Sequence, residues 1–173
     1  GNDDLVFDGR SCGFNLTGAT IARGRSFDSD VVMCDLDRSE GIAPPTDLTP
    51  ESEIWQALVL GTRDYVRKCG FSHVVLGLSG GIDSALTAAI AAEALGPSNV
   101  LGVLMPSPYS SRGSIDDALA LAASLKIGTL TLPIDEVMRA MDGTLAAAFA
   151  GTERDVTEEN IQARIRGNLL MAL

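Results

Sequence analysis

A strand, a glycine turn and a helix follow one another between Val74 and Gly96, in the sequence VVLGLSGGIDSALTAAIAAEALG. The apolar run at residues 74–78 is typical of a strand that is buried on both faces. The alanine- and leucine-rich segment from about Ser84 predicts a helix that ends at Gly96, a residue type favoured just beyond helix ends. Together with the apolar strand expected at residues 99–105, this unit predicts a parallel, right-handed crossover, because parallel strands are joined through a connection that is usually a helix.

The turn of this unit has the composition of a phosphate-binding loop. A helix N-terminus presents unpaired N–H groups and the positive end of the helix dipole. Gly80 and Gly81 allow the backbone to curl into a nest of donors, and Ser79 and Ser84 add hydroxyl donors on either side. A carboxylate beside a phosphate requires a cation between them, so Asp83 predicts bound Mg²⁺. The alternative is an ordinary tight turn, which requires neither the aspartate nor the two serines.

The rest of the chain alternates between apolar strands and amphipathic helices. Helices are predicted at residues 50–69, 114–125, 135–150 and 157–173, and strands at residues 99–105 and 129–133. This order predicts the α/β class, with a doubly wound parallel sheet and flanking helices, preceded by a short β-rich segment. The loop at residues 106–111 follows a strand end, where open α/β sheets bind ligands, so its hydroxyls either contact a nucleotide or have a structural role.

The first 38 residues have a different pattern. Short strands separated by Gly and Asp turns are predicted at residues 5–9, 12–16, 20–23 and 31–36, which is too little to fold alone. Cys12 and Cys34 are expected to be buried strand residues rather than nucleophiles, because no His, Lys or Glu set is placed to activate them. The segment around Pro44 and Pro45, residues 39–50, is predicted to be a linker to residues 51–173.

Composition excludes some classes of partner. The net charge is −10 and the Lys and Arg residues are scattered, which argues against a nucleic-acid surface. No apolar run reaches membrane-spanning length, so no membrane partner is expected. The three cysteines are widely spaced and odd in number, which fits neither a disulfide framework nor a zinc site and favours the cytoplasm.

The last helix carries polar residues beside its apolar side. Its apolar line, at four-residue spacing, consists of Ile161, Ile165, Leu169 and Leu173. Asn160 and Arg164 are also four residues apart and lie next to that line, at the expected edge of the buried face. The planar guanidinium of Arg164 suits a phosphate or a carboxylate. A surface ion pair with Glu158 or Glu159 is the alternative.

Three segments together carry a family resemblance: LGLSGGIDSALTAAI, GVLMPSPYSS and DVTEENIQARIRGNLLMAL. They resemble the synthetase domain of the glutamine-dependent NAD⁺ synthetases, N-type ATP-pyrophosphatases with an adenine nucleotide alpha hydrolase-like fold. Residues 4–9 are similar to the end of that family's nitrilase-like glutaminase domain. The resemblance implies a glutaminase-domain tail at residues 1–38, a linker at residues 39–50 and the N-terminal part of the synthetase domain at residues 51–173.

The chain is expected to be an internal fragment that is incomplete for activity. The glutaminase Cys, Lys and Glu of the family have no counterpart in it, and neither does the family's later Thr-Gly-Asn-x-x-Glu stretch, which supplies further ATP and metal contacts.

The resemblance also implies an activity and its binding residues. The family comprises ligases that convert deamido-NAD⁺ to NAD⁺: ATP adenylates the nicotinate carboxylate, pyrophosphate leaves, and ammonia from glutamine displaces AMP. Asp83 would hold Mg²⁺, and Asn160 and Arg164 would contact deamido-NAD⁺. The residues that would bind ATP are Gly77, Leu78, Ser79, Gly80, Gly81, Ile82, Asp83 and Ser84. No residue is assigned a directly catalytic role, and assembly as a homo-oligomer is expected from the family.

Two rival functions remain open. Another amidotransferase synthetase, of the GMP- or asparagine-forming type, would share the SGG-x-DS loop, although it would not be expected to share residues 160–166. A nucleotide-binding module without chemistry is the second rival.

Overall fold

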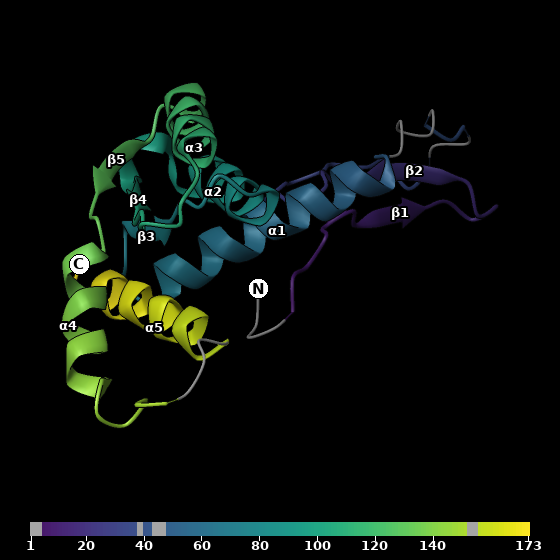
Figure 1. Cartoon of the computed structure of the whole chain (residues 1–173). Coiled ribbons are helices and arrows are strands. Elements are labelled where there is room, and N and C mark those ends of the chain that lie inside the picture. The colour runs from purple at the N-terminus through teal and green to yellow at the C-terminus, as the bar shows by residue number, and fades with distance from the viewer. Residues whose placement is uncertain (1–4, 38–39, 43–47, 152–155) are drawn as a thin grey trace. The chain divides into compact units, whose positions relative to one another are not determined.

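The computed structural model describes residues 5–37, 40–42, 48–151 and 156–173 of the 173-residue chain, with side chains described from residue 160 onward in the last range. The chain divides into two compact units, Gly1–Gly70 and Phe71–Leu173. The first unit contains β1 (Cys12–Phe14), β2 (Thr20–Arg23) and α1 (Pro50–Lys68), and the second contains the elements from β3 to α5 (Figure 1).

A parallel sheet with strand order β3-β4-β5 forms the centre of the second unit. Its strands are β3 (Val74–Gly77), β4 (Val100–Leu104) and β5 (Gly128–Thr131), with Val74 opposite Val100 and Leu101 opposite Gly128. The connections between parallel strands are α2 (Ile82–Leu95), followed by the short 3₁₀ helix η1 (Pro97–Asn99), and α3 (Arg112–Leu125). The sequence prediction of a parallel α/β layer is confirmed.

Helices cover both faces of this sheet (Figure 1). Val100 and Leu104 of β4 pack in one hydrophobic cluster with small residues of α2 and α3, such as Ala88 and Ala118. Val103 lies between these two residues along β4. It packs in a second cluster that includes residues of α4 (Asp135–Leu145) and α5 (Val156–Ala172). Because successive strand side chains point to opposite faces, the two clusters lie on opposite sides of the sheet. This two-sided burial is why the strands are continuous apolar runs.

The first unit contains an antiparallel ribbon in which Cys12 of β1 lies opposite Arg23 of β2. Gly9 and Ser26 form an isolated antiparallel bridge next to the ribbon. The strand predicted at residues 5–9 is therefore not formed as a strand, and only isolated bridge residues occur there. The strand predicted at residues 31–36 is wrong: the described structure has no strand there and all six side chains are exposed. The prediction of buried cysteines is also wrong, since Cys12 and Cys34 are exposed free thiols.

Helix α1 begins as its sequence predicts. Thr49 is the N-cap, and its Oγ1 accepts a hydrogen bond of 3.2 Å from the backbone N–H of Ser52. Pro50 occupies the first turn, where a missing N–H is harmless. The helix ends at Lys68, and Gly70 has a positive φ of 81°. None of the described helices is both long enough and apolar enough to cross a membrane.

We expect Thr49→Ala to destabilise the first unit by about 1 kcal/mol, because the Ser52 N–H loses its acceptor. Thr49→Asp is the matched control, since aspartate caps the same group and should retain the stability. Trp55, the single tryptophan of the chain, lies in α1 and reports the transition by fluorescence during urea unfolding. Equal midpoints for the alanine and aspartate variants would contradict the capping role.

Candidate functional site

The turn between β3 and α2 is held in shape by its own two serines. The Ser79 N–H donates to Ser84 Oγ at 3.2 Å, and Ser84 Oγ donates to the Gly81 carbonyl at 3.0 Å. The Gly81 N–H in turn donates to Ser79 Oγ at 3.1 Å. Gly80 has a φ of +82°, a conformation that L-residues rarely adopt. The serines therefore fold the turn, a role that the sequence did not predict; direct phosphate contacts by their hydroxyls stay a prediction.

The helix that leaves this turn offers an anion-binding end. Gly81 is the N-cap of α2 and no side chain caps the helix among the described residues. The backbone N–H groups of the first turn have no acceptor within the helix, and the dipole adds partial positive charge there. A phosphate placed at this end would accept hydrogen bonds from those groups. Asp83 lies in the first turn of α2 with an exposed side chain.

The surroundings of Asp83 fit Mg²⁺ as a shared ligand rather than as a protein-enclosed ion. Among the described residues, no group of three or more His, Cys, Asp or Glu side chains is placed to hold a metal. Mg²⁺ is commonly bound by one or two carboxylates together with substrate phosphates and water. A single exposed carboxylate beside an uncapped helix N-terminus is compatible with that mode.

A cavity of about 450 Å³ opens at the carboxyl ends of β3 and β4. This volume lies within the range of small-molecule sites, and the carboxyl ends of parallel strands are where open α/β sheets bind ligands. Its lining comprises Gly77, Leu78 and Ser79, then Leu104, Met105, Pro106 and Ser110, then Ser114 and Ile115 of α3, and finally Ala163, Arg166, Gly167 and Leu170 of α5.

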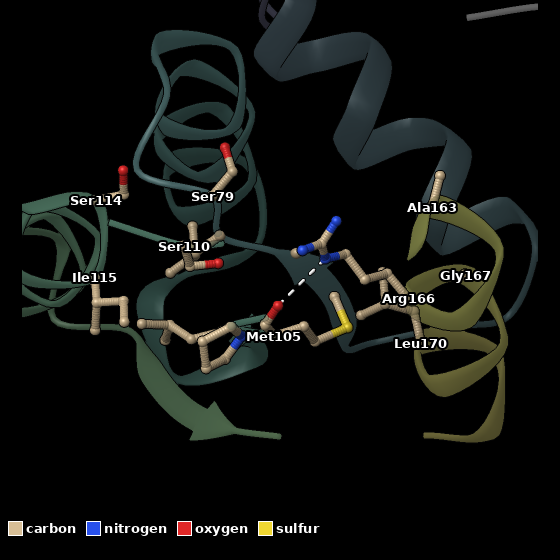
Figure 2. A pocket seen from close by; sticks show the side chains of 13 residues that line it. Ser79, Met105, Ser110, Ser114, Ile115, Ala163, Arg166, Gly167 and Leu170 are labelled. Carbon is tan, nitrogen blue, oxygen red and sulfur yellow. Dashed lines mark hydrogen bonds between the residues drawn. The ribbon is translucent and has the colours of Figure 1, made fainter. Parts of the chain in front are cut away.

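The cavity has apolar walls and a few polar groups (Figure 2). Leucine, isoleucine, methionine and proline side chains form the walls, while the hydroxyls come from Ser79, Ser110 and Ser114. Apolar walls with a few hydroxyls suit a heterocyclic base and its sugar. Because Ser79 belongs to both the cavity lining and the Gly-rich turn, one elongated ligand could occupy both.

The loop at residues 106–111 has the structural role considered for it, and contact of its hydroxyls with a nucleotide stays a prediction. The N–H of the buried Ser107 donates to Ser110 Oγ at 2.9 Å, so this serine pair shapes the loop. Ser110 also lines the cavity, whereas Tyr109 is exposed and does not.

Arg166 is a candidate site residue that the sequence analysis missed. Its Nε donates to the Met105 carbonyl at the end of β4 at 3.2 Å, and a terminal nitrogen donates to Gln162 Oε1 at 3.4 Å. Figure 2 shows the guanidinium reaching across the cavity from α5. It is the one charged side chain among the described residues that line this cavity. The helical spacing of Gln162 and Arg166 was a weak signal, but nothing in the sequence reveals the Met105 contact.

The structure does not bring Asn160 and Arg164 into this cavity. Both are exposed and line a separate hollow on α5 with Ala163, Gly167 and Asn168. The apolar line beside them is confirmed for Ile161, Ile165 and Leu169, which join the second hydrophobic cluster. The sequence prediction fails for Leu173, which is 59% exposed. The side chains of Glu158 and Glu159 lie outside the described residues, so the alternative ion pair stays untested.

The predicted ATP-binding residues divide into two groups. Gly77, Leu78 and Ser79 line the cavity, with Leu78 itself buried. The remaining residues, Gly80, Gly81, Ile82, Asp83 and Ser84, form the adjoining turn and the start of α2, where Ile82 is 79% exposed. They are contiguous with the cavity through Ser79.

Comparison with known proteins gives concordant matches. The NAD synthase family matches residues 54–173. A glutamine-dependent NAD(+) synthetase from Synechocystis sp. is 53% identical over all of this chain, and one from Thermotoga maritima is 44% identical. The chain covers 32% and 36% of these two relatives, so it spans about a third of their length. The structure of a glutamine-dependent NAD⁺ synthetase from Acinetobacter baumannii in complex with ADP has a TM-score of 0.92 at 41% identity, over 98% of this chain and 33% of that one.

Proposed function

The chain belongs to the NAD synthase family, and on this premise we propose that it contributes the ATP-binding part of a glutamine-dependent NAD⁺ synthetase. The proposed reaction is the ATP-dependent amidation of deamido-NAD⁺ to NAD⁺ by a carbon–nitrogen ligase. The observation that carries the proposal is the cavity at the strand ends, which shares Ser79 with the Gly-rich turn before α2.

ATP is the nucleotide that this arrangement supports. The apolar walls of the cavity suit adenine, and the helix end beyond Ser79 suits the phosphates. The Acinetobacter relative was solved with ADP, a molecule with the same base and a shorter phosphate chain. We propose that residues Gly77–Ser84 together bind the nucleotide, with the turn between β3 and α2 facing its phosphates.

The proposed chemistry has two steps. An oxygen of the nicotinate carboxylate bonds to the α-phosphorus of ATP while the bond to the α–β bridging oxygen breaks, and pyrophosphate departs with that electron pair. Ammonia derived from glutamine then bonds to the carbonyl carbon, and AMP departs as a proton is lost from nitrogen. The first-turn N–H groups of α2 would stabilise the negative charge on the departing pyrophosphate. Asp83 would hold Mg²⁺, which when bound supplies positive charge beside the phosphates.

Other parts of the proposal extend the family resemblance. Asn160 and Arg164 would contact deamido-NAD⁺, because an exposed amide and a guanidinium on one helix face suit its phosphates and carboxylate. Residues 1–38 would be the end of a glutaminase domain, residues 39–50 a linker and residues 51–173 part of the synthetase domain. We propose a homo-oligomer that works in the cytoplasm, where free thiols such as Cys12 and Cys69 persist.

We expect Arg166→Gln to weaken ATP binding about tenfold, which corresponds to about 1.4 kcal/mol. The variant removes both the cation of the cavity and the bond to the Met105 carbonyl. Isothermal titration calorimetry with ATP and Mg²⁺ measures the effect. Arg139→Gln is the control, because Arg139 is exposed on α4. Its Nε donates a hydrogen bond only to the backbone carbonyl of Asp135 in the same helix, among the hydrogen bonds described for it. Equal dissociation constants for the two variants would contradict a role of Arg166 in the cavity.

Steady-state turnover tests the proposed function. The full-length product of the gene that encodes this chain is supplied with ATP, Mg²⁺, glutamine and one of three acceptors: deamido-NAD⁺, xanthylate or aspartate. We expect amidation of deamido-NAD⁺ alone, with AMP and pyrophosphate formed in equal amounts. Amidation of xanthylate or aspartate instead would favour the rival synthetases, and ATP binding without turnover of any acceptor would favour the non-catalytic module.

A further inference from the structure

Two hollows on neighbouring sides of α5 share a stretch of helix surface. Ala163 and Gly167 line both the 450 Å³ cavity and the hollow beside Asn160 and Arg164. Residues four apart lie one above the other on a helix, so these two form a single patch. On a helical projection Arg166 lies to one side of the patch and Arg164 to the other, so each hollow has its own guanidinium.

The shared patch is open at Gly167. A methyl group built on Gly167 would have no atom of the described residues within 4 Å, apart from its chain neighbours and the backbone of its own helix. Packing of the described residues therefore does not require a glycine at this position, and glycine is an unfavourable residue inside a helix. Gly143, within α4, is equally open but borders neither hollow, which makes it a natural comparison. What Gly167 provides is free volume between the two hollows.

The proposed reaction requires a passage of this kind. The nucleotide is proposed to lie in the cavity and the acceptor to contact Asn160 and Arg164, yet the two reacting atoms must come within about 3–3.5 Å of each other. The two hollows meet over Ala163 and Gly167, where the helix bears only one methyl side chain and a hydrogen. A methyl group on Gly167 would occupy the route without a new contact to the described residues outside its own helix.

We propose that Ala163 and Gly167 form the crossing over which the aromatic carboxylate of the acceptor reaches the α-phosphorus of ATP. The inference rests on the proposed function and adds two positioning residues to it. At the crossing, a carboxylate oxygen bonds to the α-phosphorus and pyrophosphate departs with the electrons of the broken phosphorus–oxygen bond, so that no proton or redox partner is needed.

The test compares Gly167→Ala and Gly167→Val with Gly143→Ala and Gly143→Val in the full-length gene product. We expect Gly167→Val, which adds three carbon atoms, to raise the KM for deamido-NAD⁺ about tenfold or more, because even one extra methylene in a ligand site has an effect of about that size. Gly167→Ala should have a smaller effect in the same direction. The Tm should stay within a few degrees of the wild-type value. The dissociation constant for ATP should stay within twofold of the wild-type value. The Gly143 variants should leave the KM unchanged.

The outcomes separate the crossing from the proposed function. A wild-type KM for deamido-NAD⁺ in Gly167→Val would overturn the crossing and leave the synthetase proposal standing. An equal loss of affinity for ATP and for deamido-NAD⁺ would also overturn it, since Gly167 would then belong to the nucleotide cavity alone. If the wild-type protein does not amidate deamido-NAD⁺, the proposed function fails and the crossing fails with it.

Discussion

Gly80→Ala is expected to destabilise the second unit by about 3 kcal/mol and to abolish measurable ATP binding. Two independent effects combine at this position. The φ of +82° is strained for any residue with a Cβ, at about 1–2 kcal/mol. The added methyl group would also overlap the carbonyl oxygen of Ser114 in α3, and overpacking of this kind costs about 1–3 kcal/mol. Because the obstacle is helix backbone rather than a flexible side chain, relief requires the turn to move.

Chemical denaturation followed by circular dichroism measures the first effect, and calorimetry with ATP and Mg²⁺ measures the second. Gly113→Ala is the matched control, since Gly113 lies one residue from Ser114 and a methyl group there would make only an ordinary contact, 3.9 Å from Ser111 Oγ. That variant should be as stable as the wild type or more stable. If Gly80→Ala retained both the wild-type midpoint and the wild-type affinity, the positive φ and the close approach to α3 would be irrelevant to the turn.

Asp83→Asn is expected to lower kcat/KM about 100-fold while leaving the fold intact. The substitution keeps the size of the side chain but removes the negative charge that the proposed Mg²⁺ requires, and losing one preorganised electrostatic contact has effects of this order. The Asp83 side chain is exposed in the first turn of α2, so its neutralisation should change the Tm little.

The dependence of turnover on Mg²⁺ concentration identifies the cause. In Asp83→Asn the half-saturating Mg²⁺ concentration should rise, whereas Asp116→Asn, on an exposed position of α3 outside the cavity, should behave as the wild type. An unchanged Mg²⁺ dependence in Asp83→Asn would show that Asp83 does not hold the metal.

The part of the fold that the sequence predicted well depends on local signals. The β3 run, the Ser79–Ser84 turn and the alanine-rich α2 are encoded within about twenty consecutive residues, because strand burial, glycine conformation and helix propensity are properties of short segments. The caps of α1 are local in the same way.

The predictions that failed depended on distant partners. Residues 31–36 have strand-forming composition, but a strand exists only beside another backbone, and the described structure pairs none with them. Arg166 was missed because its acceptor, the Met105 carbonyl, lies 61 residues earlier in the chain. Phosphate contacts by the turn serines stay a prediction, and the structure adds a local bonding role that their spacing alone did not distinguish.

The central claim is that the turn joining β3 to α2 binds the phosphate tail of ATP. Titration of the ¹⁵N-labelled chain with ATP and Mg²⁺, followed by amide chemical shifts, tests it at single residues. We predict saturable shifts that are largest for Ser79, Gly80, Gly81, Asp83 and Ser84, with smaller shifts for Ser110 and Arg166 in the adjoining cavity. Saturable shifts confined to other residues, or amides of the turn that do not respond at saturating ATP, would contradict the claim.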